Sequence, residues 1–387
     1  MKTGGFMFIV GEPSGDTLGA ELATALLDQI ETSDLNKPKL FGAGGPKMSE
    51  AGVDLAFDLS AHAVVGILEV LKNYGKFKAF FDQLLALAEE RQPEAIILID
   101  YPGFNLRFAK ALRHRLRTRA TQGWNPRLIY YVSPQIWAWH ESRVHQIARD
   151  IDLMLSIFPF EKAWYAQRVP QFKVEFVGHP LVDRFLVPTN PVLKSGDTTR
   201  IILLPGSRKR ELTQHLPVLL STIRWLSEKR RVTATLVLPN ERLADLAKQL
   251  VTSDPMVRLQ IGGLAEALQN SDVAIAASGT VTMECAWFRV PTVVLYKTSW
   301  STHWFGRRFI KVKYLAMPNL LADALIFPEF IQNEATTENL GKAVTRFLDD
   351  PKVRETTQER LAETIATLGT PGASGRAAKA ILDLLKV

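Results

Sequence analysis

The sequence has 387 residues, of which 47% are apolar and 22% charged, and its net charge is +7. This balance excludes a disordered or fibrous protein, and the single cysteine, Cys285, excludes an intramolecular disulfide and a zinc site of paired cysteines. At roughly 100–200 residues per domain, the length predicts two domains. No apolar stretch reaches the roughly 20 residues of a spanning helix, so we expect a soluble protein in a reducing compartment.

Short apolar runs alternate with stretches of helical period along the first half of the chain. The first run, 6–10, precedes a Gly-rich turn and a helical pattern over 18–30. Such alternation predicts βα units around a parallel sheet. The further strands that we predict here, each followed by Gly, Pro or a polar turn, are 95–99, 128–132, 153–157 and 174–177.

The same pattern restarts in the second half of the chain. Its predicted strands are 200–204, 233–238, 273–276 and 292–296. The polar, Pro- and Gly-bearing stretch 187–197 lacks periodicity and predicts a linker. We therefore expect an α/β protein with two Rossmann-like, doubly wound domains. Their ranges are 1–187 and 198–370, and a terminal helix within 371–387 is expected to pack back on the first domain.

The turn Gly11-Glu12-Pro13-Ser14-Gly15-Asp16 follows the first strand and opens a helix. Its glycines let backbone amides approach a ligand, and a helix N-terminus favours an anion. The turn is not G-x-G-x-x-G, so it gives little support for a dinucleotide site. A plain βα turn, with Ser14 or Asp16 as the N-cap, explains the same residues.

Asp100 ends the strand 95–99, and Asn105 follows one turn later. The carboxyl ends of parallel strands border the ligand crevice, so a carboxylate there is placed to remove a proton from an attacking hydroxyl. Helix capping is the alternative role for Asp100. Asn105 likewise has two possible roles, one in the site and one structural.

Two tryptophans follow the next strand, within the turn Ser133–Trp139. Aromatic rings at a strand end offer a flat apolar wall for a sugar or an acyl chain. Packing of at least one ring in the core is the alternative.

In the second domain, Arg208 follows the first strand, where a guanidinium can bind a phosphate in bidentate fashion. Later, Ser278-Gly279-Thr280 opens a helix whose free amides can hold a pyrophosphate, and Glu284, about one turn in, can accept ribose hydroxyls. The alternatives are a surface arginine and an ordinary capped helix. No Asp-x-Asp pair ends a strand, so we expect no metal; Asp349-Asp350 is interpreted as a cap.

Together with Phe158–Glu161, Gly178–Pro180 and Pro318–Ala322, these motifs resemble, in order and over nearly the whole chain, the lipid-A-disaccharide synthase family. The resemblance implies an inverting GT-B glycosyltransferase of lipid A (lipopolysaccharide) biosynthesis, with two Rossmann-like domains facing a cleft. It would join UDP-2,3-diacylglucosamine to 2,3-diacylglucosamine 1-phosphate, giving a β-1,6-linked disaccharide 1-phosphate and UDP, without a cofactor.

The resemblance also implies roles for individual residues. Asp100 would be the base on the acceptor 6-hydroxyl and Glu12 a second acid, and which of them dominates stays open. Some members carry another acid where this chain has Gly103. The substrate-binding candidates are Ser14, Asn105, Ser133 and Trp137, and on the UDP side Arg208, Ser278, Gly279, Thr280, Glu284 and Asn319.

Part of the positive charge lies in 297–313, where basic residues alternate with aromatic ones. This pattern suits an anionic bilayer surface; a solvated basic loop is the alternative, and 64–81 is a second candidate. We expect peripheral association with the cytoplasmic membrane. The residues predicted to make the contact are Trp300, Trp304, Phe305, Arg307, Arg308 and Lys311.

Three other functions fit parts of the sequence. A UDP-N-acetylglucosamine epimerase or a peptidoglycan glycosyltransferase shares the later helix pattern but should not need the aromatic turn 133–139. A basic nucleic-acid-binding protein predicts salt-sensitive oligonucleotide affinity, yet no RNA-binding motif is present, so we expect no nucleic-acid partner. A homodimer stays open.

Overall fold

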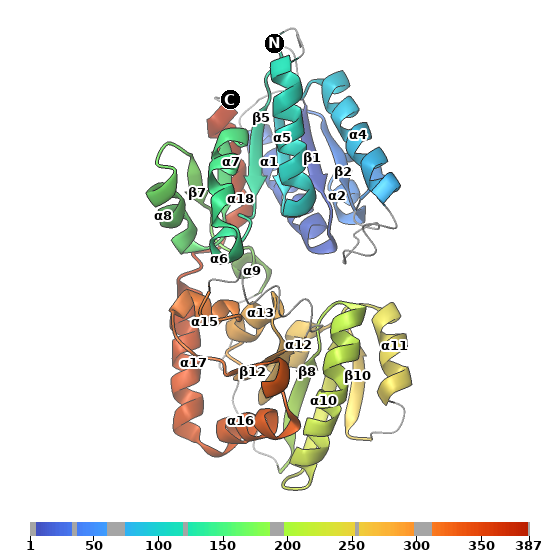
Figure 1. Cartoon of the computed structure of the whole chain (residues 1–387), viewed down its shortest axis with the longest axis vertical. Coiled ribbons are helices and arrows are strands. Elements are labelled where there is room, and N and C mark those ends of the chain that lie inside the picture. The colour runs from blue at the N-terminus through green and yellow to red at the C-terminus, as the bar shows by residue number, and fades with distance from the viewer. Residues whose placement is uncertain are drawn as a thin grey trace. The chain divides into compact units, whose positions relative to one another are not determined.

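The computed structural model describes residues 5–32, 37–59, 74–118, 123–185, 197–251, 255–297 and 312–385. The chain divides into two compact units (Figure 1). One comprises Met1–Arg184 with Leu368–Val387, and the other Phe185–Thr367. None of the helices in the described ranges combines the length and the apolar character needed to cross a bilayer.

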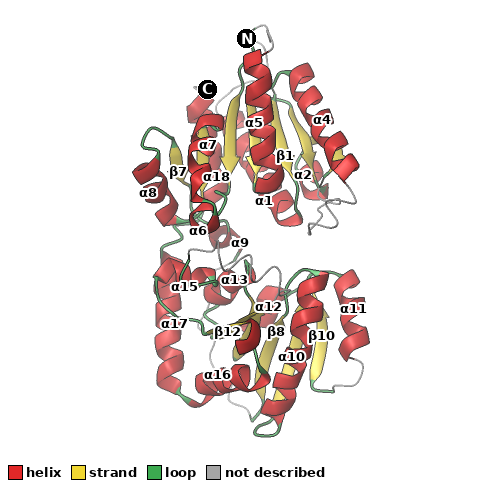
Figure 2. Cartoon of the chain, in the orientation of Figure 1, coloured by secondary structure: helices red, strands yellow, loops and turns green. Residues whose placement is uncertain are grey.

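In the first unit the described residues form a seven-stranded parallel sheet of order β3-β2-β1-β4-β5-β6-β7. Figure 2 shows its helices covering both faces. The strands are β1 (Phe6–Val10), β2 (Leu40–Gly44), β3 (Asp54–Asp58), β4 (Ala95–Ile99), β5 (Arg127–Tyr131), β6 (Leu153–Ser156) and β7 (Val174–Phe176). The helices are α1 (Pro13–Thr32), α2 (Pro46–Glu50), α4 (Tyr74–Arg91), α5 (Pro102–Thr118), α6 (Ile136–Trp139), η2 (Glu141–Arg143), α7 (Val144–Asp150), α8 (Pro159–Arg168), α9 (Leu181–Arg184) and α18 (Ala373–Leu385).

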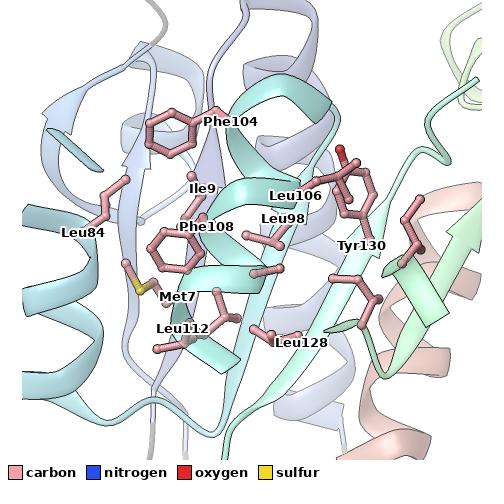
Figure 3. Close-up of a cluster of buried hydrophobic side chains, with 14 of the residues drawn as sticks. Met7, Ile9, Leu84, Leu98, Phe104, Leu106, Phe108, Leu112, Leu128 and Tyr130 are labelled. Carbon is pink, nitrogen blue, oxygen red and sulfur yellow. The ribbon is translucent and has the colours of Figure 1, made fainter. Parts of the chain in front are cut away.

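The core of this unit explains why the predicted strands were visible in the sequence. Helix α5 lays Phe104, Phe108 and Leu112 over the sheet (Figure 3), against residues such as Ile9 and Leu98. Strands covered on both faces read as continuous apolar runs, which is the pattern of β1 and β4. Two strands have no such apolar run and were not predicted: β2, which contains two glycines, and β3, an edge strand with alternating exposure.

Asp16 connects α1 to the turn that opens α2. Its carboxylate is 3% exposed and accepts hydrogen bonds from the backbone N–H groups of Gly45 (2.9 Å), Lys47 (3.0 Å) and Met48 (3.1 Å). These are the N-terminal amides of α2, which lack partners within the helix. Asp16 therefore caps α2, whereas the sequence had offered it as a cap for its own helix.

The segment that returns to the first unit, from Leu368, contacts the motif Gly178-His179-Pro180. The His179 N–H donates to the Leu368 carbonyl at 2.9 Å, and the Arg376 guanidinium donates to the Val177 carbonyl at 2.7 Å. A Cβ on Gly178, whose φ is +89°, would lie 2.5 Å from Arg376 Nη2, so this position requires glycine. Helix α18 then packs along α1, where the Gln29 side chain donates to the Gly375 carbonyl.

In the second unit the described residues form a six-stranded parallel sheet of order β10-β9-β8-β11-β12-β13. The strands are β8 (Thr199–Leu204), β9 (Val232–Leu238), β10 (Val257–Ile261), β11 (Val273–Ala277), β12 (Thr292–Tyr296) and β13 (Glu329–Ile331). The helices are α10 (Lys209–Ser227), α11 (Glu241–Val251), α12 (Leu264–Gln269), α13 (Val281–Trp287), α15 (Met317–Ala322), η3 (Gln332–Glu334), α16 (Thr337–Asp349) and α17 (Pro351–Ala366).

The second unit confirms one smaller expectation: the Asp350 side chain accepts from the Val353 N–H as the N-cap of α17. Cys285 is buried. The strands not predicted are the two sheet edges: β10 is half-buried or exposed at all but its first residue, and β13 has three residues. Short or half-exposed edge strands lack the long apolar run on which the prediction depended.

We expect Asp16→Ala to lower the free energy of unfolding by roughly 2–4 kcal/mol, because it leaves three backbone N–H groups without their acceptor. Urea denaturation followed by circular dichroism measures the change. Ser14→Ala, at an exposed position in the same helical turn, is the matched control and should change stability by less than about 0.5 kcal/mol. Equal stabilities for the two variants would contradict the capping role.

Candidate active site

Two carboxylates follow neighbouring strands of the first sheet. Glu12 comes directly after β1 and Asp100 directly after β4, and the register pairs Val10 with Ile99 at the strand ends. Burial, and then the negative charge of Glu12, raises the pKa of Asp100 to about 6, against a smaller opposing effect of the Tyr101 N–H. The carboxyl is therefore ionised at neutral pH and is more basic than an ordinary aspartate.

The backbone that carries Asp100 is held in an unusual conformation. Asp100 and Tyr101 have φ values of +48° and +50°, and Val132, after the neighbouring strand β5, has +70°. A positive φ costs roughly 1–3 kcal/mol at each residue that carries a side chain, and such a residue keeps this conformation only where its surroundings impose it. Here the Asp100 carbonyl accepts from the Asn105 Nδ2 at 2.8 Å and from the Tyr130 hydroxyl at 2.6 Å, and these bonds fix the turn.

Asn105 is the centre of this arrangement. Its side chain is fully buried, and Nδ2 also lies 3.3 Å from the Ile9 carbonyl and 3.2 Å from the Ile99 carbonyl. One amide thus joins the ends of β1 and β4. The sequence had grouped Asn105 with substrate-binding residues; in the structure its amide contacts the backbone beneath Glu12 and Asp100, a position suited to holding both acids in place.

The turn after β1 is shaped by Tyr101. A Cβ on Gly11 would lie 2.2 Å from Cδ1 of the Tyr101 ring, so only glycine fits there. That ring stacks on Phe104 with centroids 5.7 Å apart. Glu12 is half-buried, and Ser14 is exposed in the first turn of α1. Glycine in this motif therefore admits a neighbouring aromatic ring, a reason that the sequence alone did not suggest.

The aromatic turn after β5 is divided between core and surface. Ser133 is buried, with its hydroxyl 3.2 Å from the Tyr165 hydroxyl. Trp137 is half-buried and donates from Nε1 to Glu161 Oε1 at 3.1 Å, whereas Trp139 is 49% exposed. Part of the turn is therefore packed in the core, and the Trp139 ring is exposed to solvent.

In the second unit, Arg208 precedes α10 and is about half exposed. Its Nη1 lies 3.2 Å from Oε1 of Glu211, and the other oxygen of that carboxylate accepts from the Ser207 N–H at 3.1 Å. Glu211 thus satisfies the two donors, a guanidinium and a loop amide, that a phosphate would use. A bound phosphate would have to displace this carboxylate or share its donors.

His215 supports the same loop and was not found from the sequence. It is fully buried; its Nδ1 lies 2.7 Å from the Pro205 carbonyl, and its Nε2 accepts from the Lys297 N–H at 2.9 Å. Burial lowers the pKa of His215, so the neutral ring donates from Nδ1 and accepts at Nε2. No motif surrounds this histidine, and only the fold brings β12 beside the β8 loop.

The segment after β11 presents the remaining candidates. Gly279 and Thr280 are exposed just before α13, with open space around Gly279. Ser278 is half-buried and donates to the Leu315 carbonyl at 3.0 Å, and Glu284 is half-buried one turn into α13. Gly279 and Thr280 are thus accessible, whereas the Ser278 N–H donates to the Leu295 carbonyl at 3.1 Å. Binding of a nucleotide by this segment stays a prediction.

Asn319 lies deeper than these residues. It is fully buried; its Nδ2 donates to the Phe327 carbonyl and to Glu329 Oε1, both at 2.8 Å, and its Oδ1 accepts from the Ile326 and Phe327 N–H groups. Like Asn105, it organises backbone rather than presenting a free amide. Its role at the UDP side, if direct, would require these bonds to open.

Two expectations concern residues beyond these sites. The predicted membrane-contact residues, from Trp300 to Lys311, lie outside the described residues. Within the described ranges, no group of three or more His, Cys, Asp or Glu side chains is arranged to hold a metal ion.

The two-unit architecture is shared with solved nucleotide-sugar proteins. The chain aligns with the UDP complex of MnaA from S. aureus at a TM-score of 0.63 and 14% identity, covering 99% of this chain and 97% of that one. It aligns with the kitacinnamycin glycosyltransferase at a TM-score of 0.61 and 17% identity, covering 98% and 99%. These likenesses establish the two-domain, Rossmann-like fold of the GT-B glycosyltransferases.

Sequence relatives are more specific. A protein described as lipid-A-disaccharide synthase in Geobacter sulfurreducens is 38% identical, with 98% of this chain and 97% of the relative covered. One of the same description in Myxococcus xanthus is 35% identical with the same coverage. The family model described as lipid-A-disaccharide synthetase matches residues 6–382. The chain therefore belongs to the lipid-A-disaccharide synthase family.

Proposed function

We propose that this protein transfers a 2,3-diacylglucosamine unit from UDP to the 6-hydroxyl of 2,3-diacylglucosamine 1-phosphate. The products are the β-1,6-linked disaccharide 1-phosphate and UDP. The observation that carries the proposal is a half-buried aspartate with a raised pKa, beside a second acid, at the ends of β4 and β1 in a chain of this family. The relatives do not favour the epimerase, peptidoglycan or nucleic-acid alternatives.

Asp100 is assigned as the general base. An inverting transfer is a single displacement, so one base must take the proton of the attacking hydroxyl as the bond to the sugar forms. With its pKa near 6, Asp100 is ionised at neutral pH and is a stronger base than an exposed aspartate. Glu12 contributes negative charge that raises this pKa. This assignment places the acceptor on the first unit.

The second unit is assigned to the UDP-sugar. Arg208 and the amides of Gly279 and Thr280 would supply positive charge and N–H donors for the pyrophosphate, whose charge grows as the UDP leaves. Ser278, whose own N–H donates to the Leu295 carbonyl at 3.1 Å, begins the loop that presents them. Glu284, one turn into α13, would accept the ribose hydroxyls. Binding of the phosphates would free Arg208 from Glu211, so the guanidinium exchanges one anion for another.

The residues between Lys297 and Lys313 complete the proposal as a contact with the membrane. Both substrates carry acyl chains, so the enzyme must reach them at a bilayer. Basic and aromatic side chains together gain from anionic headgroups and from the interface. The protein would then be peripherally bound to the cytoplasmic membrane.

Asp100→Asn is expected to lower the rate of disaccharide formation by about 10²–10⁴-fold, because the amide cannot accept the proton. Thin-layer or mass-spectrometric detection of the disaccharide, with calorimetric titration of UDP, makes the measurement. UDP affinity should stay unchanged. Asp54→Asn, on the exposed edge strand β3, is the matched control and should keep wild-type turnover. Near-normal turnover of Asp100→Asn would remove this residue as the base.

The substrate class is tested in the same assay. UDP release by the wild-type protein should require a diacylated acceptor, and a non-acylated glucosamine phosphate should give little. Comparable release with both acceptors, or epimerisation of UDP-N-acetylglucosamine, would contradict the proposed function.

The pH profile tests the coupling between the two acids. In the wild type, kcat/KM should rise with pH through about 6 as Asp100 loses its proton. Glu12→Gln removes the negative charge that raises this pKa, so the acidic limb should move to lower pH. A limb that stays in place, or moves upward, would show that Glu12 does not act on the base through its charge.

The membrane contact predicts salt-sensitive binding to anionic vesicles. Sedimentation with phosphatidylglycerol-containing vesicles at low salt should carry the protein down, and neutral vesicles should not. The double variant Arg307→Ala, Arg308→Ala should weaken this binding several-fold. Arg242→Ala with Lys248→Ala, two exposed residues of α11, is the control of equal charge change. An equal loss of vesicle binding in both double variants would show that binding depends on the net charge alone, and would contradict a contact through this segment.

A further inference from the structure

A fully buried carboxyl group lies at the start of α8, in contact with the aromatic turn after β5. Glu161 has no exposed surface, and its two oxygens contact different elements. Oε2 accepts from the Phe158 N–H at 3.2 Å, which caps α8, and Oε1 accepts from the Trp137 indole at 3.1 Å.

The surroundings of Glu161 favour its neutral form. Burial raises its pKa to about 8, and the hydrogen bonds from the Trp137 indole and the Phe158 N–H offset this only in part. Arg168, the cation at the far end of α8, pairs with Glu141 at 2.5 Å instead. At neutral pH the carboxyl therefore keeps its proton.

The bond to Trp137 exceeds what the helix requires. A glutamate three residues after an N-cap needs one oxygen to complete a capping box. In Glu161 the second oxygen fixes the indole, while Phe160 packs edge-on against the same ring at a centroid distance of 5.0 Å. Ser133 in turn contacts the Tyr165 hydroxyl, so both ends of the turn 133–137 are tied to α8.

We propose that Glu161 is a positioning residue that fixes Trp137 for binding of the acceptor sugar. This inference rests on the proposed function, which assigns the acceptor to the first unit beside Asp100, because β5 pairs with β4 and its turn follows at the same sheet edge. Glu161 itself touches no substrate. It acts by holding the indole plane at one orientation, which lowers the cost of ordering it when the acceptor binds.

Glu161→Gln and Trp137→Phe, singly and together, test the inference. Glutamine has one acceptor oxygen for two N–H donors, so it leaves either the indole or the helix cap unpaired. We expect about a tenfold rise in KM for the acceptor, with UDP affinity unchanged. Trp137→Phe keeps a ring but removes its N–H, so glutamine can then serve Phe158 alone. The double variant should be no worse than Trp137→Phe, and multiplicative losses would overturn the inference.

The pH dependence of acceptor KM gives a readout that a purely structural role would not move. As pH rises through about 8, Glu161 ionises and its bonds to the Trp137 and Phe158 N–H groups become charge-assisted and stronger, so acceptor KM should fall. The other titratable groups nearby do not interfere: burial raises the pKa of Tyr165 far above this range, and burial lowers that of His179, whose ring is tilted against that of Phe158, to about 4. Glu161→Gln should abolish this fall.

Glu175→Gln is the matched control, because Glu175 pairs with Lys162 at the surface beside the same helix. It should keep the wild-type KM and pH profile. If Glu161→Gln does not fold, folded Trp137→Phe still tests the inference through its raised acceptor KM. Wild-type protein that makes no disaccharide would refute the proposed function, whereas wild-type behaviour of folded Glu161→Gln would refute this inference alone.

Discussion

The side-chain amide of Asn105 is the contact on which the first unit's site depends. It donates to the carbonyls at the ends of β1 and β4 and to that of Asp100, whose backbone has a positive φ. The local sequence does not favour this conformation, because a positive φ costs free energy at an aspartate, and the hydrogen bonds from Asn105 offset that cost. Asn105 and the Tyr130 hydroxyl together hold the turn in which burial and the charge of Glu12 raise the pKa of Asp100.

The second unit uses the same solution with different residues. His215 ties the loop before Arg208 to the end of β12, and Asn319 closes the turn between α15 and β13. The buried polar atoms of His215 and Asn319 are hydrogen-bonded to backbone groups. These bonds offset the cost of burying the polar atoms and favour a single loop conformation. Gly279 and Thr280, the exposed residues predicted to bind the pyrophosphate, lie in the same unit as these ordered loops.

Burial also decides which groups carry charge. It raises the pKa of Asp100 to about 6 and that of Glu161 to about 8, and it lowers that of His179 to about 4. At neutral pH the first is charged and the other two are neutral. Two carboxyl groups of one unit are therefore suited to different tasks: proton acceptance for the half-buried one, and fixed hydrogen bonding for the fully buried one.

The sequence by itself determined the central strands, the order of the motifs and the positions of both acids. Buried parallel strands are continuous apolar runs, and strand ends carry the turns that hold side chains such as Asp100. Only the tertiary structure decided that Asn105 and Asn319 hydrogen-bond to backbone groups and that Asp16 caps α2. It also decided that His215 joins the loop after β8 to the end of β12 and that Glu161 holds the Trp137 indole. Those roles depend on hydrogen-bond partners contributed by other elements, whose proximity is set by packing and leaves no local pattern in the chain.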